Sequence, residues 1–229
     1  MAHRFAARQL TTRDRELLRW IGQAGIASEG QIHRRYWAGK RLGTAQDRLL
    51  QLRKAKLVEQ HRCDVARPGE TVYTLTRKGR LLFEQAERSR LHVGLPAAHE
   101  IKQQLVAQDA YIYLAAEVQA AGGTWGDWRS ERELRSEFRQ AQNAATAGGP
   151  SAPTWEIADA QAVWTDATGS VQIVDVEIDG QYYGKMLARK LARFGGSGRP
   201  TVWICDNPRR AANIARAAAA WPTIRVITV

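Results

Sequence analysis

Four acidic residues in the second half of the sequence could together hold a cation. One is Asp159, and the other three, Asp175, Glu177 and Asp179, belong to the run VDVEIDG at positions 174–180. Acidic and aliphatic residues alternate in that run, so a β-strand there carries its carboxylates on one face. Like charges opposed on a strand pair are destabilising, and protonation, Lys or Arg partners or a divalent metal must offset them. Oxygen donors of this kind suit Mg²⁺ or Mn²⁺.

A β-hairpin must position Asp159 for such chemistry. The segments on either side of DATG (166–169) are rich in strand-forming residues, and a three-residue loop that ends in a left-handed glycine, here Gly169, is a favoured connection. That loop places Asp159 opposite Glu177. A four-residue loop would instead put Asp159 on the other face. In the alternative interpretation, Asp159 merely ends a strand and the neighbouring acids are charges at a sheet edge.

A helix predicted over 182–194 brings a lysine to these carboxylates. Its apolar stripe is formed by Tyr183, Leu187, Leu191 and Phe194. Lys190 lies next to this stripe and can extend along the sheet toward the acids, whereas Lys185 faces away. TVWICD (201–206) has the pattern of a buried strand, and a helix and a closing strand (224–229) follow. The second part of the chain is therefore predicted to be α/β.

All of the excess positive charge lies in residues 1–95. They carry 20 Lys and Arg against 9 Asp and Glu, whereas residues 96–229 carry 14 of each, and the whole chain has a net charge of +11. A strongly basic segment indicates an anionic partner, most commonly nucleic acid. We place the boundary between two domains near residue 95, where Gly94 and Pro96 interrupt the pattern.

The basic segment has the element order of a winged helix-turn-helix. Three helices are predicted to start near Thr12, Ser28 and Thr44, and two strands, 57–65 and 70–76, follow with the turn ARPG between them. In that arrangement the third helix enters the major groove of DNA. The residues expected to contact DNA are Lys40, Arg41, Thr44, Gln46, Asp47, Arg48, Arg53, Lys54, Arg62 and Arg67. The alternative is that they are solvated charges on a helical surface.

The remaining segments predict further helices over 76–90 and 99–121, a short strand at 124–128 with a polar helix after it, and a flexible loop at 145–153. No apolar run approaches the ~18 residues of a membrane helix. The two cysteines, Cys63 and Cys205, are too far apart in the sequence to indicate a disulfide or a zinc site. A cytoplasmic protein that binds double-stranded DNA and no membrane is therefore expected.

Several segments together resemble the replication-relaxation family of plasmid and mobile-element proteins. They are LTTRDRELLRWI, YTLTRKG, HEIKQQLVAQDAY, WRSERELR, ADA, VEIDG and ARKLARFG, in this order. The family is related to the MobC-type relaxases, and its second domain resembles the PD-(D/E)XK nuclease fold. The resemblance implies a winged helix-turn-helix over residues 1–95. It implies a restriction-endonuclease-like α/β domain with a central mixed sheet over residues 96–229.

The resemblance also implies Mg²⁺-dependent (or Mn²⁺-dependent) DNA strand cleavage. Asp159 and Glu177 stand where the two acidic residues of the motif stand, and with Asp179 they form the implied metal-ligand set. Glu131 resembles the acidic residue of the first helix, with Glu133 as a substitute. Two positions depart from the motif. The motif's proline is Ala158 here, and its lysine is replaced by Asp179. We expect Lys190 to take the role of that lysine, with Lys185 as the second choice.

Two functions follow from the sequence. In the first, the protein recognises an origin-type site and nicks or processes DNA by metal-dependent hydrolysis. In the alternative, it is a non-catalytic relaxosome accessory factor or transcriptional repressor, whose second domain serves dimerisation or binds other relaxosome or replication proteins. The histidines do not form the His-hydrophobe-His cluster of tyrosine-dependent relaxases, so a covalent tyrosyl mechanism is not expected.

Overall fold

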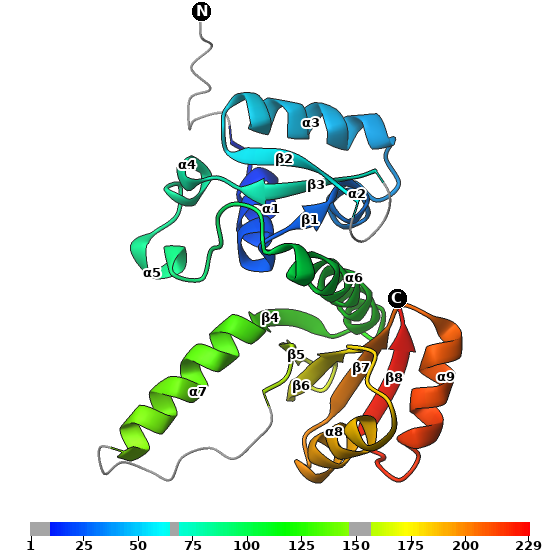
Figure 1. Cartoon of the computed structure of the whole chain (residues 1–229). Helices are drawn as coiled ribbons and strands as arrows, with labels where there is room; N and C mark the ends of the chain where they lie inside the picture. Colours follow the sequence, from blue (N-terminus) through cyan, green and yellow to red (C-terminus); the bar gives the residue numbers. More distant parts are fainter. Residues whose placement is uncertain (1–9, 65–68, 147–156) are drawn as a thin grey trace, which may run out of the picture. The chain divides into compact units, whose positions relative to one another are not determined.

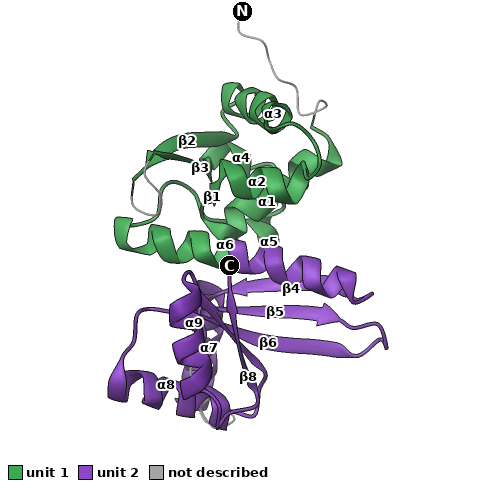
Figure 2. Ribbon diagram, turned by 90° about the vertical axis from the view of Figure 1, so that its right-hand side faces the viewer, with its two compact units in different colours: residues 1–108 green, residues 109–229 purple. Residues whose placement is uncertain are grey.

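A computed structural model describes residues 10–64, 69–146 and 157–229 of the chain. Within these ranges it contains nine helices, a three-stranded antiparallel sheet and a five-stranded mixed sheet, which confirms the mixed α/β class (Figure 1). The chain divides into two compact units, residues 1–108 and 109–229 (Figure 2). The boundary predicted near residue 95 precedes the helix in which the two units divide.

The first unit begins with the three predicted helices, α1 (Thr12–Ala24), α2 (Glu29–Tyr36) and α3 (Leu42–Lys54). The N-cap of α1 is Thr11, one residue before the predicted Thr12, because Asp14 completes a capping box with Thr11. The predicted capping box between Ser28 and Gln31 is present at the start of α2.

The first unit's sheet has the strand order β1-β3-β2, with β1 (Ala27–Ser28), β2 (Val58–Cys63) and β3 (Glu70–Leu75). The two longer strands were predicted; β1 has only two residues, too few to produce a sequence pattern. The single helix predicted over 76–90 is wrong, because the chain forms two short helices, α4 (Arg77–Arg80) and α5 (Gln85–Arg88). The side chain of Arg88 donates hydrogen bonds to the carbonyls of Leu81 and Phe83 between them.

Helix α6 (Ala98–Ala120) supplies residues to both units. Its first turns pack Ile101 and Leu105 against the sheet side chains Cys63 and Val72, together with Ile26. The buried side chain of Gln31 donates a hydrogen bond of 2.7 Å to the carbonyl of Leu105. Each helix of the described part of the chain is too short or too polar to cross a membrane.

The second unit is built on a sheet of order β4-β5-β6-β7-β8. The strands β4, β5 and β6 pair antiparallel, whereas β6, β7 and β8 are parallel. The elements are β4 (Thr124–Ser130), α7 (Glu131–Thr146), β5 (Ala160–Thr165), β6 (Val171–Ile178), α8 (Gly184–Gly196), β7 (Thr201–Cys205), α9 (Pro208–Ala217) and β8 (Ile224–Thr228). Of the loop predicted over 145–153, the first two residues form the end of α7, and residues 147–153 lie outside the described residues.

The hairpin between β5 and β6 has the predicted register. Ala160 pairs with Val176, and Asp166 donates its backbone N–H to the carbonyl of Ser170 at 2.9 Å. Gly169 has a φ of 87°, which a glycine adopts without steric cost. The three-residue loop is therefore confirmed.

Helices α8 and α9 pack against β7 and β8 in a hydrophobic core cluster. The core side chains include Leu187, Leu191, Phe194, Trp203, Ile214 and Ile224. The rings of Phe194 and Trp203 meet edge to face with centroids 6.2 Å apart. The prediction that Tyr183 belongs to the buried stripe is wrong, because Tyr183 is the N-cap of α8 and its side chain is 68% exposed.

Candidate functional site

The structure brings Asp159, Glu177 and Lys190 together in the second unit. Glu177 lies near the end of β6 with no exposed surface, and the ammonium of Lys190 on α8 forms an ion pair with its Oε1. Asp159 is anchored to the same strand, because its Oδ2 accepts a hydrogen bond of 2.8 Å from the backbone N–H of Ile178. Lys190 also donates to the hydroxyl of Tyr182 at 3.1 Å.

The electrostatics of Lys190 follow from these neighbours. Burial by itself lowers the pKa of the lysine, but Glu177, the Tyr182 hydroxyl and Asp159 together outweigh this and raise it. The ammonium is therefore charged at neutral pH. The site consists of two carboxylates and one internal cation.

The other two carboxylates have separate basic partners. Asp179 receives two hydrogen bonds from Arg210 of α9, Nε to Oδ2 at 2.7 Å and Nη2 to Oδ1 at 3.0 Å. Asp175 accepts from Arg199 at 3.1 Å and from the amide of Gln161 at 2.9 Å. Of the ways to offset crowded carboxylates, the fold uses Lys and Arg partners, with Lys190 on Glu177, Arg199 on Asp175 and Arg210 on Asp179.

The implied set of three metal ligands is not assembled. Asp179 does not join Asp159 and Glu177, since Arg210 takes both its oxygens. Within residues 10–64, 69–146 and 157–229, no group of three or more His, Cys, Asp or Glu side chains could hold a metal ion.

Glu131 and Glu133, the two acidic residues in the first turn of α7, have partners in or next to that helix. Glu131 accepts a hydrogen bond of 2.8 Å from Nε of Arg135, one turn further along. Glu133 accepts from the backbone and the hydroxyl of Ser130 at 2.9 and 2.8 Å, in the manner of a capping residue. Lys185, the second choice for the motif lysine, is exposed on α8. Lys190 is therefore the lysine that the fold places beside the acids.

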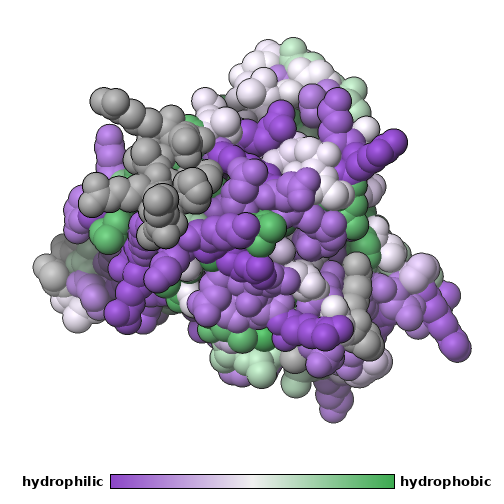
Figure 3. Space-filling view, turned by 90° about the horizontal axis from the view of Figure 1, so that it is seen from above, coloured by the Kyte–Doolittle hydropathy of each residue, from purple (hydrophilic) through white to green (hydrophobic). Residues whose placement is uncertain are grey.

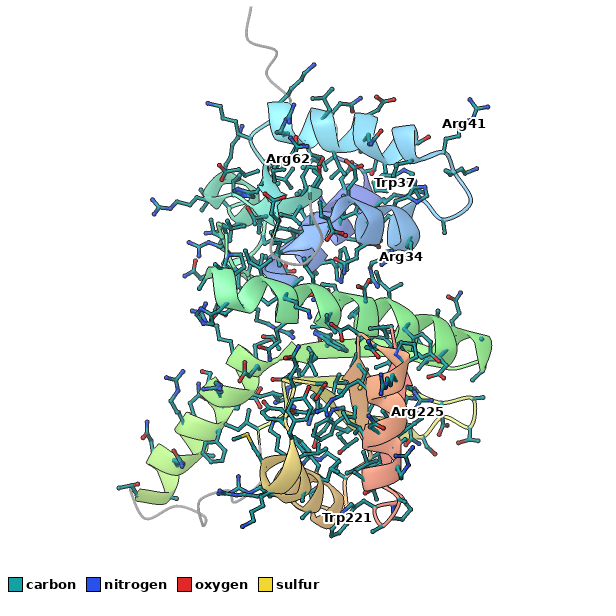
Figure 4. The ribbon with its side chains drawn as sticks, turned by 45° about the vertical axis from the view of Figure 1, so that its right-hand side comes forward. Arg34, Trp37, Arg41, Arg62, Trp221 and Arg225 are labelled. Atoms are coloured by element: carbon teal, nitrogen blue, oxygen red, sulfur yellow. The ribbon has the colours of Figure 1, made fainter. Side chains whose placement is uncertain are left out.

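In the first unit, several predicted DNA-contacting residues surround the start of α3. Lys40, Arg41 and Thr44 are exposed, and Arg41 extends away from the ribbon (Figure 4). The loop before the helix is held by its own hydrogen bonds: the ring of His33 donates to the carbonyl of Lys40 at 2.8 Å, and the Lys40 N–H donates to the carbonyl of Trp37 at 2.9 Å. The first turn of α3 contains no acidic residue, and the N-cap Arg41 makes no side-chain cap.

Farther from the start of α3, Lys54 is exposed at the end of the helix. Arg62, labelled in Figure 4, is exposed on β2. Asp47 is exposed on α3 itself. Arg67 lies outside the described residues. Viewed from above, hydrophilic residues dominate the surface, with hydrophobic ones in small separate spots (Figure 3). This face therefore presents no large continuous apolar patch.

Three other predicted DNA-contacting residues have side-chain partners within the first unit. Arg48 donates from Nε to Oδ1 of Asp14 at 2.7 Å, and it thereby clamps α3 to α1. Gln46 donates to Glu29 at 2.7 Å, and Arg53 contacts Gln60. Asp14 is only 1% exposed. Burial raises the pKa of Asp14, but hydrogen bonds from Arg48 and Thr11 more than offset this and hold it below its usual value.

Sequence reasoning missed Arg210, Tyr182 and Asp14. Arg210 follows β7 and Asp179 follows β6, and the ends of neighbouring parallel strands meet at one edge of a sheet. The order of the parallel strands could therefore have predicted the contact between Arg210 and Asp179. For Asp14, a carboxylate three residues after a capping threonine is the signal of a capping box, but its contact with Arg48 has no local pattern.

The fold and the site define a mixed α/β protein that combines a basic helical unit with a sheet carrying ion-paired carboxylates. The family model for replication-relaxation matches residues 18–195, from α1 to the end of α8. The chain belongs to the replication-relaxation family. A search of curated proteins and a search of solved structures return no match. The matched range includes Asp159, Glu177 and Lys190 but stops before Arg210.

Proposed function

We propose that the protein binds duplex DNA at an origin-type site of a plasmid or mobile element, and that its first unit does so as a winged helix-turn-helix. The order of α1, α2 and α3 followed by the β2–β3 hairpin is the order of that motif, in which the third helix enters the major groove. Membership of the replication-relaxation family supports the plasmid setting.

The observation that carries this proposal is the N-terminus of α3. It combines the positive end of the helix dipole with Lys40 and Arg41, and it has no carboxylate in its first turn. Backbone N–H groups and basic side chains at such an end attract phosphate. Thr44 is exposed in the same turn and can reach a base edge or a phosphate.

The other basic residues divide into two roles. Lys54 and Arg62 are exposed at the end of α3 and on the wing strand β2, where they can contact the DNA backbone. Arg48 instead orients α3 through Asp14. Replacing Arg48 is therefore expected to reduce stability along with DNA binding, whereas replacing Arg41 reduces binding alone.

A salt series tests the proposal. We expect the affinity of the protein for a labelled duplex of the cognate region to fall with salt, with a slope of about −0.9 per phosphate contact on a double-logarithmic plot. Arg41→Ala should weaken binding and make the slope shallower by about one contact. Arg216→Ala removes an exposed arginine from α9 and serves as the matched control. Binding that is independent of salt, or equal in both variants, would refute the role of α3.

Strand cleavage is a second candidate function, and the convergence of Asp159, Glu177 and Lys190 favours it. Magnesium keeps several waters and is usually bound by one or two carboxylates together with substrate phosphates. Asp159 and Glu177, with the adjacent Ile178 carbonyl, fit that requirement. Asp179 does not, because Arg210 occupies both its oxygens.

In this second function Asp159 and Glu177 would hold the ion. A bound Mg²⁺ supplies an activated water and Lewis-acid stabilisation of the phosphoryl group. The chain itself contributes the ammonium of Lys190, which the Tyr182 hydroxyl holds beside the acids, and a positive charge there stabilises negative charge that develops on a phosphate.

Supercoiled plasmid carrying the cognate region separates the two functions. Nicking by the wild type with Mg²⁺ or Mn²⁺, lost in Asp159→Ala and Glu177→Ala but kept in the exposed control Glu117→Ala, supports the enzyme. Unimpaired binding without nicking under both metals supports a non-catalytic accessory factor or repressor. In that case the second unit would serve dimerisation or bind other relaxosome or replication proteins.

A further inference from the structure

Tyr183 is an exposed aromatic side chain whose ring is supported by an arginine. Its side chain is 68% exposed at the start of α8, and the guanidinium carbon of Arg210 lies 4.4 Å from the ring centroid. Arg210 is fixed in turn by its two hydrogen bonds to Asp179 and by a contact with the Tyr182 carbonyl. The ring is therefore presented to solvent on a rigid cationic base.

The loop that carries Tyr183 is itself constrained. Gln181 has a φ of 59°, in the left-handed region. A Cβ on Gly180 would lie 2.7 Å from the ring of Tyr182, so a larger residue there would displace the ring from its present position. Tyr182 stacks under the ammonium of Lys190, 4.3 Å from its ring centroid. The two tyrosines thus have separate cationic partners, and only Tyr183 faces outward.

A positive stripe runs along the exposed face of α8, the helix whose N-cap is Tyr183. Lys185, Arg189 and Arg193 recur every four residues and are exposed, on the side of the helix opposite the buried Leu187 and Leu191. At 1.5 Å per residue they are about 6 Å apart along the helix axis. The first turn of α8 contains no acidic residue.

We propose that Tyr183 and the stripe of Lys185, Arg189 and Arg193 form a binding track for single-stranded DNA. An exposed aromatic ring and a row of cations on the same helix supply the two features with which proteins bind single strands, because a base can stack on the ring while the phosphates follow the charges. A duplex keeps its bases stacked inside and offers nothing to Tyr183. The inference rests on the proposed function, that this protein acts on DNA.

The track also gives Asp179 a role. Sequence reasoning assigned it to a metal, whereas the structure uses it to hold Arg210 under Tyr183. Asp179 is a positioning residue, and its loss should act through Arg210 and the tyrosine ring.

Fluorescence anisotropy with a labelled oligo-dT strand, in parallel with the labelled cognate duplex, tests the track in the full chain. Tyr183→Ala should weaken oligo-dT binding about 5- to 150-fold, the range for one base stacked on an aromatic ring. Tyr183→Phe should retain binding, since it keeps the ring. Tyr113→Ala removes another exposed tyrosine, on α6, and is the matched control. Arg189→Ala should make the salt slope shallower by about 0.7.

The parallel measurement with the cognate duplex separates this inference from the proposed function. Tyr183→Ala should leave duplex binding unchanged, and Arg41→Ala should weaken duplex binding more than oligo-dT binding. Oligo-dT binding that Tyr183→Ala leaves unaltered, or that Tyr113→Ala weakens equally, would overturn the track while duplex binding stands. A protein that binds oligo-dT through Tyr183 but fails to bind the duplex would retain the track and refute the role of α3.

Discussion

The ion pair between Lys190 and Glu177 gives the sharpest prediction about the second unit. Lys190→Met removes the ammonium but keeps most of the apolar volume of the side chain. Glu177 is then left as a carboxylate with no exposed surface and without its cation. Breaking a buried pair in this way costs about 3–5 kcal/mol, because the remaining charge stays buried and uncompensated.

That cost is a large part of the total free energy of unfolding, which is about 5–15 kcal/mol for a typical protein. At an m value of about 2 kcal/mol/M, the urea midpoint should fall by about 2 M. The double variant Glu177→Gln with Lys190→Met should recover part of the loss, since it removes both charges. Arg225→Ala breaks the exposed pair with Glu117 and should cost less than about 1 kcal/mol.

Urea unfolding followed by tryptophan fluorescence reads this out, because six of the eight tryptophans lie in residues 109–229. The pKa of Lys190 is raised, so the contribution of its ammonium is complete at neutral pH and is lost as the pH rises above the usual lysine value of 10.5. A Lys190→Met protein as stable as the wild type at pH 7, or a double variant no more stable than the single one, would refute this reasoning.

Three further predictions concern individual contacts. Asp14→Asn should lower the free energy of unfolding by about 2–4 kcal/mol, because it weakens the contact with Arg48. The pKa of Asp14 is lowered, so this contribution is present above the usual aspartate pKa of 3.8 and is lost as the pH falls below that value. Urea unfolding at pH 7 and at pH 3 measures the difference. Gly195→Ala should cost about 1–3 kcal/mol in thermal melts, since its Cβ would lie 2.4 Å from the Trp221 ring, whereas Gly196→Ala meets no atom within 4 Å. Gly169→Ala should cost about 1 kcal/mol by calorimetry, and Gly169→Asn less, because asparagine tolerates the left-handed turn.

The hairpin that carries the acids could be derived from sequence because local rules decide it. The Gly169 turn fixes the register, and a register error of one residue would turn every side chain of the strand to the other face. Lys190 was likewise placed by helical periodicity. Lys190 lies beside the buried stripe of α8, and its ammonium pairs with Glu177, as the helical periodicity predicted.

Contacts between distant segments could not be derived in this way. The pairing of Arg48 with Asp14 joins residues 34 positions apart, and sequence reasoning saw only an exposed arginine near the start of a helix. From sequence alone, a basic side chain that binds a phosphate on a helix cannot be distinguished from one that pairs with a carboxylate of the same protein. Only the tertiary structure distinguishes the two.

The departure at Asp179 connects the two features of the second unit. Where the resemblance to the nuclease motif implies a lysine, this chain has an acid, and Lys190 of α8 pairs with Glu177. Asp179, just after β6, accepts hydrogen bonds from Arg210, which follows the neighbouring parallel strand β7. The guanidinium of Arg210 in turn contacts the ring of Tyr183. If this exchange underlies both features, restoring the motif with Asp179→Lys should place two lysines beside Glu177 and free Arg210. Oligo-dT binding should then fall while duplex binding by α3 persists, since only the support of Tyr183 has been removed.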